Sequence, residues 1–193
     1  NNVFADAVIR EIEAQGCNAL CFFSTSSPDA ASGCGGFKEA LSKYVCADGK
    51  CYADVFINTI KFSLFSIRAC ALDDLTKLNI TVLQAYTLYR SYQEWYENFD
   101  GMSAVEVAYS VSLPEFDGII HSCPVTTMER DAEGKQVTQE IAERMNMLVR
   151  KAKKLALLRI KPNAEKKIAI VFHNHPSTNS NIGSCSAIDS IES

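Results

Sequence analysis

The sequence has no long hydrophobic run, and its charge is not strongly of one sign. Its apolar segments are all far shorter than the roughly 20 residues that a membrane-spanning helix needs. No basic segment followed by an apolar one opens the chain, so we expect no secretory signal peptide. The formal net charge of −4 gives no reason to expect a nucleic-acid partner. We therefore expect a chain with no membrane span that does not act on nucleic acid.

Several motifs of common functional sites are also missing. None of the eight cysteines is spaced as C-x2-C, so a zinc knuckle or a thioredoxin-like site has no support. Residues 33–36 match neither a P-loop nor a dinucleotide-binding fingerprint, and we expect no ATP binding by this chain itself. Cys21 and Cys70 lie in apolar runs, so we expect both to be buried and to pack as small apolar side chains. We interpret the cysteines as reduced thiols of a cytoplasmic protein.

The length and composition are those of a globular chain. Its 193 residues, 47% apolar and 22% charged, correspond to about one domain with a sizeable core. The first residue is Asn1, and a helical pattern starts at once, so we expect an excerpt of a longer polypeptide. We predict an α/β domain over residues 1–166. Residues 167–193 would supply a strand and a loop that begin the next structural unit or complete the sheet.

Short apolar segments alternate with helical patterns along the chain. Helical spacing of apolar residues predicts helices near the N-terminus, at residues 37–45, 91–99 and 103–111, and in a long segment after residue 140. Ser103 and Glu106 have the spacing of a capping box. Runs rich in β-forming residues predict strands at 19–23, 53–57, 80–83 and 166–172, with a short extended run at 117–120. This alternation predicts a three-layer α/β fold, Rossmann-like but without the dinucleotide fingerprint, in which helices flank a mostly parallel sheet.

Positive charge is concentrated in one part of the chain. The segment from Arg144 to Lys167 has a net charge of +8, whereas the remainder carries −12. One interpretation is a solvated helix face. The other is a docking surface for an acidic partner or for a ligand with several carboxylates.

The first polar cluster spans residues 113–121. Glu115 and Asp117 are two residues apart, so in an extended segment they would point to one side. Two neighbouring carboxylates can divide proton transfer between them or ligate a metal ion. An ordinary turn with the sequence Pro-x-x-Asp-Gly is the alternative. We expect this cluster beside a strand end, since ligands of open α/β sheets bind at the carboxyl ends of strands.

The second polar cluster spans residues 172–184 and contains two of the three histidines. His173 and His175 could face one cavity from an extended segment, and imidazole suits cobalt, zinc or nickel. The Asn, Ser and Gly residues that follow offer hydrogen-bond donors for anions. A polar loop that caps the next element is the alternative interpretation.

Both clusters resemble motifs of one protein family. Leu113-Pro-Glu-Phe-Asp-Gly118 resembles the LPELDG motif of the large subunit of ATP-dependent cobaltochelatase (CobN type), a relative of the magnesium-chelatase H subunit. Residues 161–174 resemble the family segment KPNAEKKVAIILHN, and residues 176–193 resemble PPTNANIGSAAGLDTPES. The resemblance is specific from about residue 80 onward. Phe116, His175 and Ser177 depart from the family pattern.

The resemblance implies an interior part of a large chelatase subunit. Such a subunit binds a tetrapyrrole, here a corrin precursor of cobalamin biosynthesis, and inserts a divalent metal ion, cobalt in preference to magnesium. Adaptor and AAA+ ATPase partners would hydrolyse the ATP, and the isolated chain would be inactive. A magnesium-chelatase-like subunit acting on a porphyrin, and a non-catalytic tetrapyrrole-binding or scaffold domain, are the alternatives.

The resemblance also assigns roles to individual residues. Glu115 and His173 would be catalytic, as base or ligand, because metal insertion must remove two pyrrole N–H protons. The substrate-binding residues would be Asp117, Asn174, Asn179 and Asn181, and Glu115 and His173 would also be metal ligands. His175 departs from the family pattern, and we add it as a metal ligand because His173 and His175 could face one cavity from an extended segment.

Overall fold

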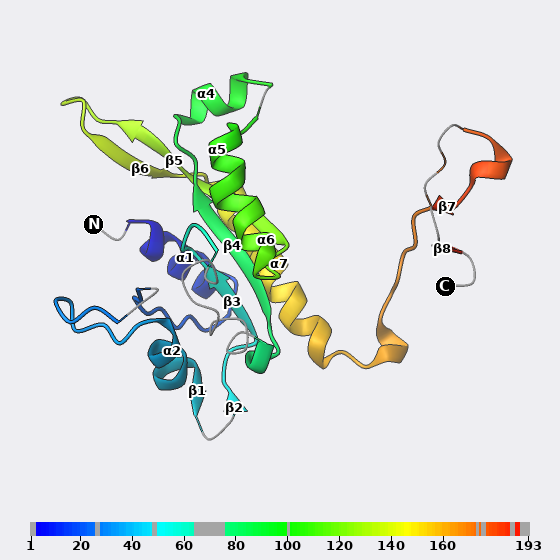
Figure 1. Ribbon diagram of the computed structural model, residues 1–193, viewed down its shortest axis with the longest axis horizontal. Coiled ribbons are helices and arrows are strands. Elements are labelled where there is room, and N and C mark those ends of the chain that lie inside the picture. The colour runs from blue at the N-terminus through cyan, green and yellow to red at the C-terminus, as the bar shows by residue number, and fades with distance from the viewer. Residues whose placement is uncertain are drawn as a thin grey trace. The chain divides into compact units, whose positions relative to one another are not determined.

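The computed structural model describes residues 3–25, 28–47, 50–63, 76–99, 101–172, 174, 177–185 and 188–189 (Figure 1). The chain divides into two compact units, Asn1–Arg159 and Ile160–Ser193. Among the described residues no helix is both long and apolar enough to cross a bilayer.

A four-stranded sheet forms the centre of the first unit. Strands β3 (Val55–Asn58), β4 (Thr81–Thr87) and β5 (His121–Arg130) run parallel, and β6 (Gln136–Glu140) pairs antiparallel with β5. The strand order is β3-β4-β5-β6. The expected mostly parallel sheet is therefore confirmed.

Two long helices, α1 (Val3–Ala14) and α7 (Ala142–Ile160), cover one face of this sheet (Figure 1). Because strand side chains alternate between faces, Leu83 and Ala85 of β4 point to this side. The apolar stripe of α7 packs on them because its residues recur at helical spacing. The buried residues of this core are Ala7, Val8, Leu83, Ala85, Cys123, Val125, Met145, Leu148 and Ala152.

Shorter helical segments lie on the opposite side. Near the start of the strands, α2 (Phe37–Ala40) and the helical turn η1 (Leu41–Val45) bury a second core with Leu78. Farther along, a helical run of α5 (Ala104–Val107), η2 (Ala108–Ser112) and α6 (Leu113–Phe116) completes this side. The short helix α4 (Tyr92–Glu97) lies beyond the carboxyl end of β4 (Figure 1). Helices on both faces of the sheet make the fold three-layered, as predicted.

The expected capping box at the start of α5 is present. The Ser103 hydroxyl accepts a hydrogen bond from the Glu106 backbone N–H, and the Glu106 carboxylate accepts one from the Ser103 N–H. Ser91 and Glu94 form a second capping box at the start of α4. These side chains satisfy N–H groups that have no partner inside the helix.

The strand predicted at residues 19–23 is not formed. The backbone there pairs with no strand of the described chain, and Cys21, expected to be buried, is exposed. Only Phe22 of this run packs well, with its ring centroid 5.7 Å from that of Tyr44. An apolar run becomes a strand only where a neighbouring strand offers its hydrogen-bonding edge, which the sequence pattern does not reveal. Cys70 lies outside the described residues.

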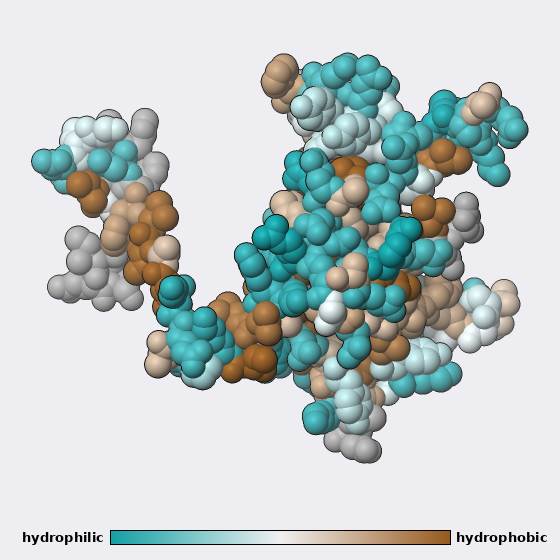
Figure 2. All heavy atoms as spheres, turned by 180° about the vertical axis from the view of Figure 1, so that it is seen from behind, coloured by the Kyte–Doolittle hydropathy of each residue, from teal (hydrophilic) through white to brown (hydrophobic). Residues whose placement is uncertain are grey.

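The strand predicted at residues 166–172 is also not formed. This segment belongs to the second unit, pairs with no described strand, and leaves Ile168 84% and Val171 92% exposed. Figure 2 shows hydrophobic side chains along it. The second unit otherwise contains the single helical turns η3 (Asn163–Glu165) and η4 (Asn179–Asn181), and a hairpin of β7 (Ser184–Cys185) and β8 (Ile188–Asp189).

Candidate functional site

The segment that carries Glu115 and Asp117 is helical, not extended. Pro114 stands in the first turn of α6, where its fixed φ suits a helix start. The backbone N–H groups of Asp117 and Gly118 donate to the carbonyls of Pro114 and Glu115 at 2.9 Å each. Gly118 then takes φ +77°, a left-handed conformation that glycine adopts without steric cost. The predicted extended run at residues 117–120 is therefore replaced by a helix end and a turn.

This geometry separates the two carboxylates. Glu115 is exposed, whereas Asp117 is only 6% exposed. The Ser63 hydroxyl donates a hydrogen bond to Asp117 Oδ1 at 2.6 Å. The expectation that both carboxylates point to one side is wrong, because helical residues two apart face different directions.

A cavity of about 350 Å³ lies at the amino ends of β4 and β5. Asp117 and His121 are its titratable lining residues among the described ones. The described residues that line it are Thr76, Ile80, Thr81, Val82, Asp117, Gly118, Ile120 and His121. We expected the cluster of residues 113–121 at the carboxyl end of a strand, but it precedes β5 and therefore lies at the amino end.

His121 is the first residue of β5 and is partly buried. Burial lowers the pKa of its imidazole, and the positive charge of Lys151 lowers it further. A lowered pKa keeps the ring neutral at neutral pH, and a neutral imidazole can accept a proton or bind a metal ion.

A row of polar side chains crosses the sheet next to this cavity. Asn58 and Gln84 are register partners on β3 and β4, and both are fully buried. The Asn58 amide donates to Gln84 Oε1 at 2.7 Å, and the Gln84 amide donates to the Ile60 carbonyl at 2.9 Å. Ser122 of β5 continues the row opposite Gln84. These bonds hold the loop after β3, which also carries Ser63, in its position beside Asp117.

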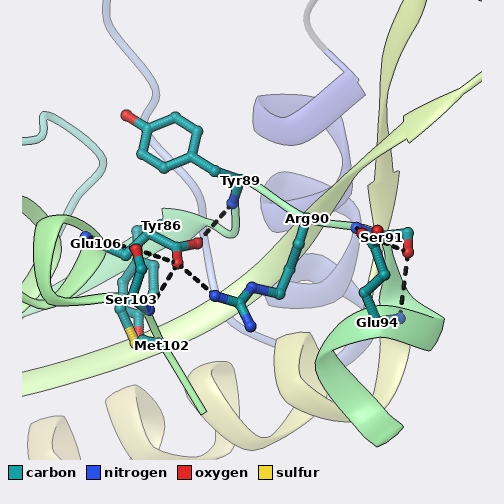
Figure 3. Close-up of polar contacts among 8 residues, drawn as sticks. All are labelled: Tyr86, Tyr89, Arg90, Ser91, Glu94, Met102, Ser103 and Glu106. Carbon is teal, nitrogen blue, oxygen red and sulfur yellow. Dashed lines mark hydrogen bonds and ion pairs between the residues drawn. The ribbon is translucent and has the colours of Figure 1, made fainter. Parts of the chain in front are cut away.

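A second polar network lies beyond the carboxyl end of β4 (Figure 3). The carboxylate of Glu106 is 3% exposed and accepts hydrogen bonds from the backbone N–H groups of Tyr89 and Ser103, at 2.8 and 2.9 Å. Arg90 forms an ion pair with it at 3.2 Å. Burial by itself would raise the pKa of Glu106, but the hydrogen bonds from Tyr89 and Ser103 and the charge of Arg90 together lower it.

Tyr86 lies beside this network, and its hydroxyl donates to the sulfur of Met102 at 3.1 Å (Figure 3). Burial raises the pKa of Tyr86 to about 12, so the phenol stays protonated. The network joins the end of β4 to the start of α5, and every group in it is used for structure.

The predicted residues of the second cluster belong to the second unit. His173 and His175 lie outside the described residues, so their predicted roles as catalytic group and metal ligands stay predictions. Asn174 and Asn179 are exposed, and Asn181 ends the turn η4. Within the described part of the chain, no group of three or more His, Cys, Asp or Glu side chains is arranged to hold a metal ion.

Sequence reasoning missed His121 and the row of Asn58 and Gln84. His121 closes the segment that drew attention to Glu115, and a histidine four residues after Asp117 was an available signal. Asn58 and Gln84 had no such signal, because a polar residue in a strand is normally read as facing solvent.

Comparisons with known proteins find cobaltochelatase and magnesium-chelatase relatives. A family model described as CobN/Magnesium Chelatase matches residues 1–193. The chain is 29% identical to the aerobic cobaltochelatase subunit CobN of Pseudomonas aeruginosa, over 71% of this chain and 11% of that protein. It is 27% identical to the chloroplastic magnesium-chelatase subunit ChlH of Oryza sativa, over 95% of this chain and 13% of that protein.

A solved structure is similar as well. The catalytic subunit of cobaltochelatase from Mycobacterium tuberculosis superposes with a TM-score of 0.67 at 28% identity, over 88% of this chain and 14% of that one. The chain spans only between 11% and 16% of the length of the curated relatives that it matches.

Proposed function

Because the chain belongs to the CobN/magnesium chelatase family, we propose that it is part of a large subunit that inserts a divalent metal ion into a tetrapyrrole. The observation that carries this proposal is the family match over the whole chain. The cavity at the amino ends of β4 and β5 supports it, since the family motif around Glu115 continues into the cavity wall at Asp117 and Gly118.

The groups at this cavity suit the chemistry of metal insertion. Two pyrrole N–H protons must leave the macrocycle, so the reaction needs a positioned base. Glu115 is not one of the described lining residues, but it is exposed and lies two residues before Asp117, and we assign it the role of base or transient metal ligand. Asp117 contacts the substrate in this proposal, while its hydrogen bond from Ser63 fixes its orientation. The neutral imidazole of His121 is a further acceptor at the same cavity.

The predicted roles of residues in the second unit are a further part of this proposal. We assign His173 as ligand or second base and His175 as a further ligand, and the amides of Asn174, Asn179 and Asn181 bind the peripheral carboxylates of the substrate. A cavity of about 350 Å³ is at the low end for a ligand site. A tetrapyrrole with its side chains is larger, so the first unit would enclose only part of it.

Cobalt and a corrin precursor are the proposed substrates, within cobalamin biosynthesis. Two relatives with cobaltochelatase in their names support this choice, whereas the plant relative is named as a magnesium chelatase. Partner subunits of the AAA+ type, with an adaptor, would hydrolyse ATP, and the complex would act in the cytoplasm. Magnesium and a porphyrin remain the second candidate.

An absorbance titration tests this proposal. A cobalt-free corrin precursor and a metal-free porphyrin are each added to the 193-residue chain and to its full-length polypeptide. We expect a saturable band shift with the corrin precursor, weakened about tenfold or more in Glu115→Gln, because a lost charged hydrogen bond costs about 1.5–3 kcal/mol. Glu133→Gln is the matched control, since Glu133 is an exposed carboxylate in the turn between β5 and β6.

The outcomes separate the alternatives. Unchanged binding and chelation in both Glu115→Gln and His173→Ala would refute the assigned site. A shift with porphyrin alone would favour the magnesium candidate. Absence of any shift with a folded full-length polypeptide would refute tetrapyrrole binding and favour a scaffold role.

A further inference from the structure

Two cysteines face one another on a short hairpin of the first unit. Strands β1 (Cys46–Ala47) and β2 (Lys50–Cys51) pair antiparallel, with Cys46 opposite Cys51 and Ala47 opposite Lys50. Among the described cysteines, these two are the pair that a strand register places directly opposite each other.

The hydrogen bonds of the hairpin define the geometry of this pair. The Tyr52 N–H donates to the Val45 carbonyl at 3.0 Å, so Val45 and Tyr52 are a hydrogen-bonded pair. Hydrogen-bonded and non-hydrogen-bonded pairs alternate along an antiparallel ladder, so Cys46 and Cys51 form a non-hydrogen-bonded pair. Such pairs have Cα atoms about 4.5 Å apart, and disulfides span Cα distances of about 4.4–6.8 Å. The backbone therefore holds both thiols within bonding reach.

The surroundings leave both thiols available for reaction. Both residues are half-buried, and both pack against the core formed by Phe37, Leu41, Val45 and Leu78. Burial raises the pKa of the Cys46 thiol, and the neighbouring Cys51 raises it further. A raised pKa lowers the fraction of Cys46 that is thiolate at neutral pH, so oxidation that starts at this thiol should become faster as the pH rises, because the thiolate is the nucleophile.

We propose that Cys46 and Cys51 form a redox-active pair that closes to a cross-strand disulfide with an oxidised low-molecular-weight thiol, such as glutathione disulfide, as the oxidant. One protein thiolate attacks a sulfur of glutathione disulfide and releases one glutathione thiolate, which leaves a mixed disulfide. The second protein thiolate attacks the protein sulfur of that bond and releases the second glutathione. Two electrons pass from the cysteine pair to glutathione, and the two thiol protons end on the glutathione produced.

The sequence between the two cysteines allows a direct test. Trypsin cleaves after Lys43, Lys50 and Lys61, so Cys46 and Cys51 fall in separate peptides, residues 44–50 and 51–61. The 193-residue chain is equilibrated in a series of glutathione ratios, alkylated, digested and analysed by mass spectrometry. We expect the two peptides joined by a disulfide that dithiothreitol breaks. The same series in 6 M urea measures how much the closeness of the two cysteines in sequence contributes by itself to disulfide formation.

Folding should change the glutathione ratio at which the cysteine pair is half oxidised. The folded chain should reach half oxidation at a glutathione ratio about tenfold more reducing than the unfolded chain, which corresponds to about 30 mV. Cys34→Ser is the matched control and should leave the link unchanged. Cys34 has a pKa lowered by hydrogen bonds, first from Thr25, so it reacts readily but has no opposite cysteine in a strand register.

Three results would overturn the proposal. One is recovery of both peptides with separate alkyl or glutathione groups at the most oxidising ratio, while circular dichroism shows an intact fold. Another is the same glutathione ratio at half oxidation in the folded and the unfolded chain. That result would show that the disulfide forms because the two cysteines are close in sequence, and not because of the fold. The third is loss of the link in Cys34→Ser, which would show that the pair does not form the disulfide without Cys34.

Discussion

At the scale of single residues, the environment of a carboxylate decides what it can do. Glu115 and Asp117 are two residues apart, yet one is exposed and the other is held by Ser63. Glu106 is buried, and its charge is stabilised by Arg90 and by two backbone N–H groups. Exposed Glu115 is therefore accessible from solvent, as its proposed role requires, whereas Glu106 stabilises the structure.

The first prediction concerns Glu106→Gln. We expect this change to lower the free energy of unfolding by about 2 kcal/mol at pH 7, because it removes a charged acceptor and leaves Arg90 half-buried without its partner. The pKa of Glu106 is lowered in the folded state, so the unfolded state takes up protons first as the pH falls. The difference in the free energy of unfolding between wild type and variant should therefore shrink once the pH falls below 4.5, the ordinary pKa of a glutamate side chain.

Urea unfolding at pH 7 and pH 4 measures this difference. Glu97→Gln is the control, since Glu97 is an exposed carboxylate at the end of α4. If the free energy of unfolding lost in Glu106→Gln stays constant or grows on acidification, the ionic role of this side chain would be contradicted.

At the scale of elements, helix α7 has a buried apolar face and faces rich in basic residues. Met145, Leu148, Val149 and Ala152 are its buried residues, and Met145, Leu148 and Ala152 belong to the core formed with the sheet. Its other faces carry most of the positive charge found between Arg144 and Lys167. The apolar stripe, and not helix propensity, fixes the position of this element.

Two methionines of α7 provide the second prediction. Met145→Ala should lower the free energy of unfolding by about 3 kcal/mol, because Met145 is fully buried and its truncation leaves a cavity. Met147→Ala on the same helix should change it by about 0.5 kcal/mol or less, since Met147 is 47% exposed. Denaturant unfolding of both variants gives the comparison. Equal losses in the two variants would contradict the assigned orientation of α7.

At the scale of the whole molecule, the two compact units differ in what holds them together. The three hydrophobic cores found among the described residues all consist of residues before Arg159. The second unit contains short turns and one two-residue hairpin, and its apolar segment 166–172 is exposed. The first unit therefore contains the apolar burial that stabilises a fold.

Removal of residues 160–193 tests this division. The shortened chain should unfold cooperatively with a Tm within about 2 °C of the full chain, since no buried core is lost. Thermal unfolding followed by circular dichroism measures both Tm values. A large drop in Tm, or a loss of cooperativity, would show that the tail stabilises the first unit.

Periodicity within the sequence determined the features that depend on local order. The helical stripe of α7, the strands β3 and β4 and the Ser103–Glu106 capping box were all predictable, because their signals lie within a few residues of one another. The family motif around Glu115 also identified the part of the chain that forms a cavity wall, although not the strand end at which the cavity lies.

Tertiary structure decided what depends on residues far apart in the chain. Residues 19–23 and 166–172 have the composition of strands, but strands need a partner edge, and none in the described chain pairs with them. Asp117 is buried because Ser63, 54 residues away, donates to it. Gln84 is buried because the neighbouring strand brings Asn58 to it. A polar group can leave water only when folding supplies its hydrogen-bond partner, and that pairing is a property of the assembled sheet.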